Sequence, residues 1–410
     1  MKWLLVSVML LLALPTMAKE GDTFRPYVSY TRYYDSNLFR LAEGETSFAV
    51  EDGTYKLVTL DDASDQYGVL GVGLNVDWKL GRQQLVASLN KTLVSYSKYS
   101  SLDYDGEDYR ATWNWRLGNH WSGQLGATQA VTQTNFSDLQ TFNINGTPVF
   151  LAVSNLVTRD RQFASADWEL HPRWRAGAGG AWSTSENSRL QQRSNDYEDD
   201  SEYVYLTYLT PKGSKLRGEF RHQDAKYPYR ELVAGSLIDN SYTQSEYNFV
   251  GDWTVSGKLL THLKLGLVDR QFPTVTTRDY SELAGRATVD YFPTGKTALT
   301  LAIYREPAPV EEVNSSFLIN DGANLNAAWL LSDKVTVRAS ASYVQGTYDL
   351  ILPGLPQRID DTVSGSLSLS YTPLPMATID IGLQAGSRDS TYSIYDYSFH
   401  SVYLGVRADF

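Results

Sequence analysis

The chain has 410 residues, a formal net charge of −11 and no cysteine. The acidic balance excludes nucleic-acid binding, which depends on clustered positive charge, and the lack of cysteine excludes disulfides and thiolate chemistry. Aromatic residues are abundant, with 28 tyrosines and 10 tryptophans, and membrane proteins concentrate these two residue types in belts at the membrane interfaces.

The N-terminus has the pattern of a secretory signal. Lys2 precedes an apolar run over residues 3–14, and Ala18 provides a small residue at the expected cleavage position. The run is too short for a membrane anchor helix, and no later stretch approaches 18 apolar residues. The sequence therefore predicts a signal peptide over residues 1–18 and a single domain over residues 19–410, without a transmembrane helix.

Alternating strands follow. Residues 25–33 predict a first strand and residues 34–64 a long polar loop. The next two strands, 66–80 and 83–96, flank a tight turn at Gly81-Arg82. In the first of these two, alternate residues from Leu70 to Trp78 are apolar, which is the period-2 pattern of a strand with one apolar face.

The same unit recurs to the end of the chain. Tight turns are expected near residues 118, 172, 212, 257, 294, 333 and 374, and longer loops lie between them, for example at 135–157. An aromatic residue stands shortly before each turn: Trp78, Trp115, Trp168, Tyr208, Trp253, Tyr291, Trp329 and Tyr371. Strands of about 12–16 residues, with short turns alternating with long loops and an aromatic girdle, are typical of outer-membrane barrels.

The fold class is therefore all-β, a transmembrane antiparallel β-barrel. Two strands for each of eight turns, plus the first and last strands, give 18; the alternative is 16, because the first strand and residues 187–228 are less regular. Either count leaves room for an aqueous lumen. Lys91 breaks the apolar face of strand 83–96, and either a bulge or an interfacial position explains it.

The last strand ends in Phe410, which closes an alternating apolar face. Such a terminal aromatic residue resembles the signal that the barrel insertion machinery reads. We therefore expect outer-membrane lipid and this machinery as partners, and the Gram-negative outer membrane as the location.

The polar faces of the strands are expected to line the lumen. The candidate lumen-lining residues are Asp77, Arg116, Asp167, Arg175, Asp252, Arg286, Asp290, Arg338 and Arg407. They could form a charged track that sets selectivity, or they could pair across neighbouring strands and stabilise the wall.

No catalytic constellation stands out. The five histidines are scattered, and none has the spacing of a metal site. The glycine-rich stretches at residues 71–73 and 177–180 lie within strand patterns, so they are not phosphate loops; small residues there admit close neighbours or widen the lumen. We expect no enzyme activity, no cofactor and no metal, although a Ser/His site assembled in space stays an alternative.

One segment carries family information, Tyr34-Asp35-Ser36-Asn37-Leu38-Phe39-Arg40 directly after the first strand. It resembles the EpsL-type outer-membrane proteins of exopolysaccharide operons, which belong to a wider group of β-barrel porins. The resemblance implies an outer-membrane component of exopolysaccharide synthesis and secretion. Asp35, Ser36 and Asn37 could equally form a turn that ends the strand.

Two functions remain. The first is a passive conduit or accessory for an exopolysaccharide chain, with a periplasmic polysaccharide-export protein as a further partner. The alternative is a general or solute-specific diffusion porin. The two functions would differ at loop 34–64, which is a candidate constriction of the lumen. If the loop folds into the lumen, Asp61, Asp62 and Asp65 would make the pore prefer cations.

Overall fold

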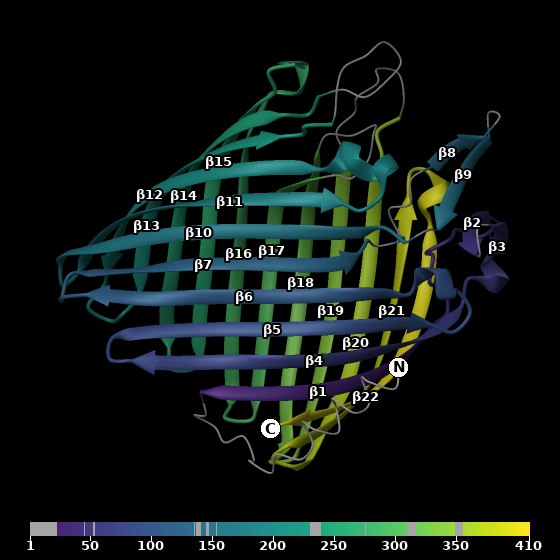
Figure 1. Ribbon diagram of the computed structural model, residues 1–410. Helices are drawn as coiled ribbons and strands as arrows, with labels where there is room; N and C mark the ends of the chain where they lie inside the picture. The colour runs from purple at the N-terminus through teal and green to yellow at the C-terminus, as the bar shows by residue number, and fades with distance from the viewer. Residues whose placement is uncertain are drawn as a thin grey trace.

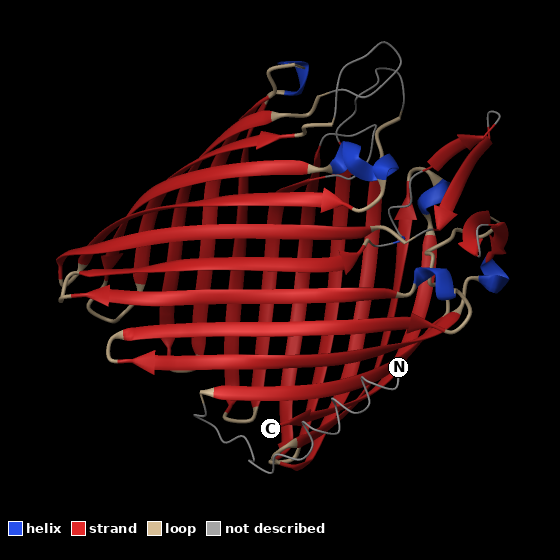
Figure 2. Cartoon of the chain, viewed as in Figure 1, coloured by secondary structure: helices blue, strands red, loops and turns tan. Residues whose placement is uncertain are grey.

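The computed structural model describes residues 23–410 except 45, 52–53, 135, 137–140, 145–146, 153, 230–238, 275, 310–316 and 349–355. β-strands dominate it (Figure 2). The predicted signal peptide, residues 1–18, lies outside the described residues, so the division into a leader and a single domain over residues 19–410 stays a prediction.

Eighteen strands form one closed antiparallel barrel, which confirms the fold class and the count of 18 rather than 16 (Figure 1). The strands are β1 (Phe24–Asp35), β4 (Asp65–Leu80), β5 (Gln83–Tyr96), β6 (Tyr104–Leu117), β7 (Trp121–Gln133), β10 (Leu156–His171), β11 (Trp174–Asn187), β12 (Tyr197–Leu209), β13 (Lys215–Lys226), β14 (Tyr242–Ser256), β15 (Leu259–Gln271), β16 (Tyr280–Thr294), β17 (Thr297–Pro309), β18 (Phe317–Ser332), β19 (Val335–Tyr348), β20 (Ile359–Leu374), β21 (Ala377–Ser390) and β22 (Tyr397–Asp409).

Closure joins the first barrel strand to the last. β1 pairs with β22 on one side and with β4 on the other, and β7 pairs with β10 across the second long loop. The amide N–H of Phe410 extends the first of these ladders by donating to the carbonyl oxygen of Pro26 at 2.8 Å. Each of the 18 strands therefore has two partners, so the sheet has no free edge.

Because successive side chains of a strand point to opposite faces, one face of each strand lies on the outside of the barrel. The large apolar side chains of that face are exposed, as a lipid-facing surface requires. Exposed aromatic residues form one belt near the tight turns: Trp78, Trp121, Trp168, Trp174, Trp253, Tyr291, Trp329 and Tyr371. A second group near the loops, which the sequence did not reveal, comprises Tyr34, Trp182, Tyr247 and Tyr343.

The eight tight turns lie at one end of the barrel and the longer connections at the other (Figure 1). Gly81, Gly118 and Gly213 have φ of 60°, 58° and 84° in three of these turns. This left-handed conformation is accessible to glycine without steric cost, which explains its place there.

The loop end carries structure that the sequence did not predict. β2 (Thr46–Glu51) and β3 (Thr54–Thr59) form a hairpin in loop 34–64, and β8 (Thr141–Ile144) and β9 (Thr147–Ala152) form another in loop 135–157. β2 pairs with β9 in parallel, so the two hairpins make a separate four-stranded sheet beyond the barrel strands (Figure 1).

Short 3₁₀ helices occupy other parts of the loop end. They are η1 (Leu60–Asp62), η2 (Ser100–Leu102), η4 (Leu190–Asn195), η5 (Thr276–Arg278) and η6 (Ser393–Tyr395). Among the described residues, no helix is long and apolar enough to cross a membrane.

Lys91 lies on the outer face without a bulge, because β4 and β5 pair continuously and Lys91 stands opposite Val72. Its ammonium group contacts Glu107 at 3.3 Å and Asp105 at 3.6 Å, both on the outer face of β6. The exception in the apolar pattern is therefore an ion-paired lysine in the loop half of the barrel, where it can remain hydrated.

We predict that the tight turns face the periplasm and the loops face the cell surface, because short periplasmic turns and long outer loops are the usual arrangement. Single cysteines at Asp62 and Leu190, both exposed at the loop end, should react with a membrane-impermeant maleimide in whole cells. Cysteines at Lys296 and Asp333, in tight turns, should react only after permeabilisation. Labelling of only the turn cysteines in whole cells would invert the orientation.

Candidate functional site

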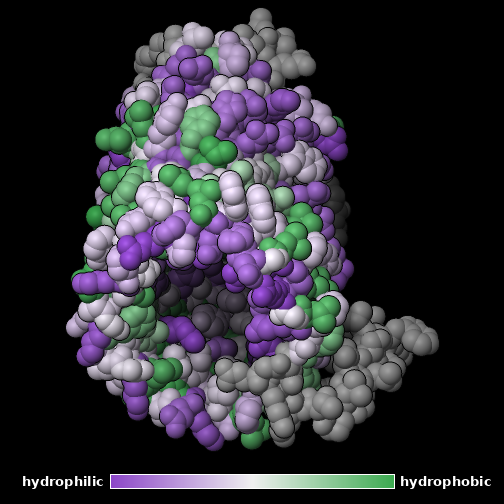
Figure 3. Space-filling model, turned by 90° about the vertical axis from the view of Figure 1, so that its left-hand side faces the viewer, coloured by the Kyte–Doolittle hydropathy of each residue, from purple (hydrophilic) through white to green (hydrophobic). Residues whose placement is uncertain are grey.

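The inner face of the barrel is the candidate site. Figure 3, viewed from the side where the β4–β5 and β6–β7 turns lie, shows an opening into the barrel edged by many hydrophilic residues. The nine predicted lumen-lining residues all occupy the strand phase opposite to the exposed apolar side chains. Their strands belong to every part of the barrel wall, so the nine residues do not form one compact centre.

Three neighbouring strands bring two of the predicted residues together. Nδ1 of His262 on β15 lies 2.9 Å from Asp252 Oδ1 on β14, and its Nε2 lies 3.2 Å from Asp290 Oδ2 on β16. Thr300 donates a further hydrogen bond to Asp290 at 2.5 Å. His262 therefore links the two carboxylates across three neighbouring strands, on the inner wall near the turn end of the barrel.

The other seven residues each have a local partner. These contacts are Asp77 with Gln84 at 2.7 Å, Asp167 with Tyr205 at 2.7 Å, Arg175 with Glu169 at 3.5 Å, Arg286 with Glu306 at 2.7 Å, Arg407 with Asp409 at 2.7 Å, Arg338 with Ser370 at 2.8 Å, and Arg116 with the Asn119 carbonyl at 3.5 Å. Pairing along and across strands stabilises a sheet. That these residues also set selectivity stays a prediction.

Inward tyrosines lie flat on glycines of the neighbouring strand. A Cβ added at Gly177 would stand 2.3 Å from the Tyr205 ring, and one at Gly73 would stand 2.4 Å from the Tyr27 ring. Only glycine permits this approach, because any side chain would push the ring into the lumen. The two glycine-rich stretches therefore admit close neighbours, one of the two roles expected for them.

Arginines stack on several of these rings. The Arg217 guanidinium lies 4.1 Å from the Tyr205 ring centroid and that of Arg407 lies 3.7 Å from the Tyr27 centroid. Arg286 on Tyr304, at 4.2 Å, repeats the arrangement over Gly322. Such cation–π contacts hold both groups against the wall, so the lumen stays lined by planar groups rather than filled by long side chains.

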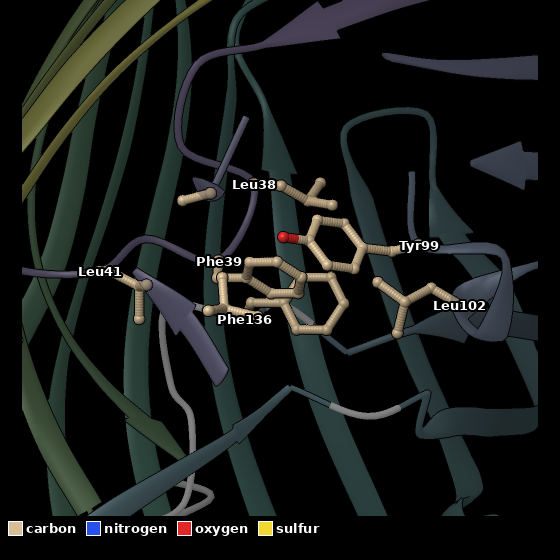
Figure 4. Close-up of a cluster of buried hydrophobic side chains, with 8 residues drawn as sticks. Leu38, Phe39, Leu41, Tyr99, Leu102 and Phe136 are labelled. Carbon is tan, nitrogen blue, oxygen red and sulfur yellow. The ribbon is translucent and has the colours of Figure 1, made fainter. Parts of the chain in front are cut away.

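The Tyr34–Arg40 segment turns over the loop-end rim. Leu38 and Phe39 are buried in a cluster of side chains from three loops (Figure 4), here named the rim cluster: Leu38, Phe39, Leu41, Val58, Ala63, Tyr99, Leu102 and Phe136. The ring centroid of Phe39 lies 4.8 Å from that of Tyr99 and 5.2 Å from that of Phe136. Tyr67 and Tyr96, which face inward, pack against the cluster.

The polar residues of the segment fix its path. Arg40 forms a two-pronged ion pair with Asp35, at 2.8 and 2.9 Å, and lies over the Phe399 ring at 3.7 Å. Asn37 donates to the carbonyl oxygens of Leu41 and Ser398, both at 3.0 Å. Arg40 has a φ of 54°, and the charge-assisted hydrogen bonds offset this unfavourable conformation.

The expected turn after the first strand is therefore present, and it has a second role. It tethers the loops between β1 and β4, between β5 and β6, and between β7 and β10 to one another. The cluster partners Tyr99, Leu102 and Phe136 were not predicted, because single apolar residues in polar loops give no periodic signal. Tyr34 itself points outward.

Catalytic chemistry has no positive support in the part of the chain that the structure describes. No group of three or more His, Asp or Glu side chains there has the geometry to hold a metal ion. The absence of a cofactor and of enzyme activity stays a prediction.

Part of the chain is similar to a known family. Residues 250–410, from β14 to the C-terminus, match the model of a family described as "Putative beta-barrel porin 2". No curated protein matches the chain in sequence.

Among solved structures, OccK2 (OpdF) from Pseudomonas aeruginosa shares the fold. OccK2 (OpdF) is 8% identical with a TM-score of 0.50, over 94% of this chain and 98% of that chain. The OccK2 complex with glucuronate gives 0.49 at the same identity and coverage, and OpdQ gives 0.48 at 9% identity over 95% of this chain and 99% of that chain.

We predict that Phe39→Ala loosens the rim cluster and leaves the barrel folded. Removing a buried phenylalanine costs about 3–5 kcal/mol in a packed core, and the two rings that pack on this one, Tyr99 and Phe136, belong to loops rather than to barrel strands. Trypsin should cut the variant faster after Lys98, beside the cluster, while the barrel remains heat-modifiable on gels. Leu190→Ala, at a loop residue that is 75% exposed, should behave like the unaltered protein. An unchanged cleavage rate in Phe39→Ala would contradict the tethering role.

Proposed function

We propose that this protein is a passive, porin-type channel of the outer membrane. The observation that carries the proposal is the wall: a closed 18-strand barrel with an apolar outer face, an inner face of paired acids and bases, and an opening at the turn side (Figure 3). A barrel of this strand number is wide enough for water. The porin family match over residues 250–410 supports the same function.

The side chains of the inner wall favour the passage of hydrated solutes and discriminate only weakly between them. Charges of both signs alternate along the wall and are satisfied locally, as in Arg286 with Glu306 and Arg407 with Asp409. Paired charges produce a weaker net field than a ring of one sign, so we expect no strong preference for cations or anions.

Purified protein added to planar lipid bilayers should therefore produce stepwise conductance that rises in proportion to salt concentration. The reversal potential in a salt gradient should lie close to zero, and the double substitution Arg286→Ala/Arg407→Ala should move it toward cation preference, because two acids lose their partners. Heat-denatured protein is the control. Folded protein that inserts but gives no conductance steps would refute the channel.

The finer proposal is that the cargo is an exopolysaccharide chain. The resemblance of Tyr34–Arg40 to EpsL-type proteins supports it, and so does the path of loop 34–64. The β2–β3 hairpin of this loop pairs with β9 in the sheet beyond the barrel strands, and not with the barrel wall. A polymer needs a lumen without a constriction loop, whereas a diffusion porin gains selectivity from one. A periplasmic polysaccharide-export protein would meet the turn end.

Deleting the gene tests the cargo. Surface polysaccharide should be lost, its synthesis enzymes should remain active, and uptake of small solutes should change little. A plasmid carrying the unaltered gene should restore the polymer, and Arg338→Ala should restore it as well, because passage depends on many weak contacts. Normal surface polysaccharide with slowed uptake of one small solute would instead establish the diffusion porin.

A further inference from the structure

A polar pocket of about 320 Å³ lies in the inner wall near the loop end, between β12 and β17. Its lining comes from six successive strands and combines carboxylates, carboxamides, basic groups and tyrosines. The volume is at the lower end of the range for small-molecule sites. Polar side chains from the inner faces of these strands converge on it.

Planar polar groups in this pocket hold one another in place. The Gln244 amide donates to Glu246 at 2.7 Å and to Gln223 at 3.4 Å, and Asn248 donates to the other oxygen of Glu246 at 3.0 Å. Gln223 in turn donates to Asp199 at 2.6 Å. Gln244 and Asn248 are only 4% and 5% exposed, so their orientations are fixed before any ligand arrives, which lowers the entropic cost of binding.

Aromatic rings complete the lining. Arg270 lies 3.9 Å from the Tyr242 ring centroid and donates to the Gln244 carbonyl oxygen at 2.7 Å. The rings of Tyr197 and Tyr227, also in the lining, have centroids 6.1 Å apart. Tyrosine offers an apolar ring with a polar end, so it can pack against the C–H face of a ligand while hydroxyl groups are hydrogen-bonded nearby.

This combination matches a sugar ring. Each sugar hydroxyl both donates and accepts, and carboxylate and carboxamide groups present two polar atoms in one plane to adjacent hydroxyls. The axial C–H groups of the ring form apolar faces that suit tyrosine. A purely apolar ligand would offer no hydrogen bonds to the amides and carboxylates that it covers, at a cost in free energy.

The charge of the pocket selects an uncharged sugar. Three carboxylates line it, Asp199, Glu246 and Glu306, against Lys264 and Arg270. Lys264 is already paired with Glu246 at 3.4 Å. Glu306 is paired in turn with Arg286 at 2.7 Å, and Arg270 donates to Gln244 at 2.7 Å. The carboxylate of a uronate would therefore have to compete with Glu246, Glu306 and Gln244 for these basic groups, whereas a neutral hexose would not.

We propose that this pocket is a subsite for an uncharged sugar ring, at which a sugar pauses during its passage through the lumen. The proposal rests on the channel function proposed above and adds the place and the chemical class of the contact. The ring hydroxyls bind Glu246, Asn248 and Gln223, and the ring face packs on Tyr242.

Sugar-induced current interruptions in planar bilayers test it, with maltotriose as the neutral probe and glucuronate as the charged one. Maltotriose should interrupt the current reversibly and saturably, and glucuronate should not. Glu246→Gln should raise the half-saturating concentration of maltotriose about tenfold, the effect of losing one charge-assisted hydrogen bond. Tyr242→Leu should do the same, and Tyr242→Phe, which keeps the ring, should not.

Asp380→Asn is the matched control, because it makes the same chemical change on the inner face of β21, outside the pocket. It should leave the interruptions unaltered, and every variant should keep the open-channel conductance. Equal interruption in Glu246→Gln and the unaltered protein, or conductance without interruption, would overturn the subsite. Absence of conductance in the unaltered protein would refute the channel instead; calorimetry of maltotriose with the detergent-solubilised barrel would then decide the subsite alone.

Discussion

Closure of the hydrogen-bonded ladder is the constraint on which the rest of the structure depends. In hydrocarbon, a backbone N–H or C=O without a partner costs several kcal/mol, so a sheet that spans a membrane must have no edge. Here β1 meets both β22 and β4, and β7 meets β10. Once the sheet is closed, strand alternation alone decides which side chain meets lipid and which meets water.

Glycine and tyrosine then determine how much of the lumen is empty. The chain has 28 tyrosines. Those that face inward would narrow the lumen if their rings pointed toward the barrel axis. Tyr27, Tyr205 and Tyr304 instead lie on glycines of the next strand, and arginines cover them. The glycines are visible in the sequence, but the residue that each one contacts depends on the register between strands. That register places Gly177 opposite Tyr205, which lies 28 residues later in the sequence.

The barrel was predictable because its signals are local. An aromatic residue, a tight turn and an alternating strand occur within about 20 residues, and that unit repeats along the chain. The rim cluster was not predictable, because it joins Phe39, Tyr99 and Phe136 from three different loops. The same reason hid the pocket, whose polar side chains come from six strands. For Lys91, the alternatives were a bulge and an interfacial position. The continuous register between β4 and β5 excludes the bulge, and neither that register nor the ion pair with Glu107 can be read from the sequence.

The structure also separates the role of the Tyr34–Arg40 segment from the question of cargo. Asp35, Asn37 and Arg40 are occupied by contacts within the rim, and Phe39 is fully buried. These residues cannot touch a passing solute without leaving that packing. This segment therefore takes no part in recognition while it stays packed. The inner wall, by contrast, offers many polar side chains of both charge signs. A wall of this kind favours brief contacts over tight binding, as passage through a channel requires.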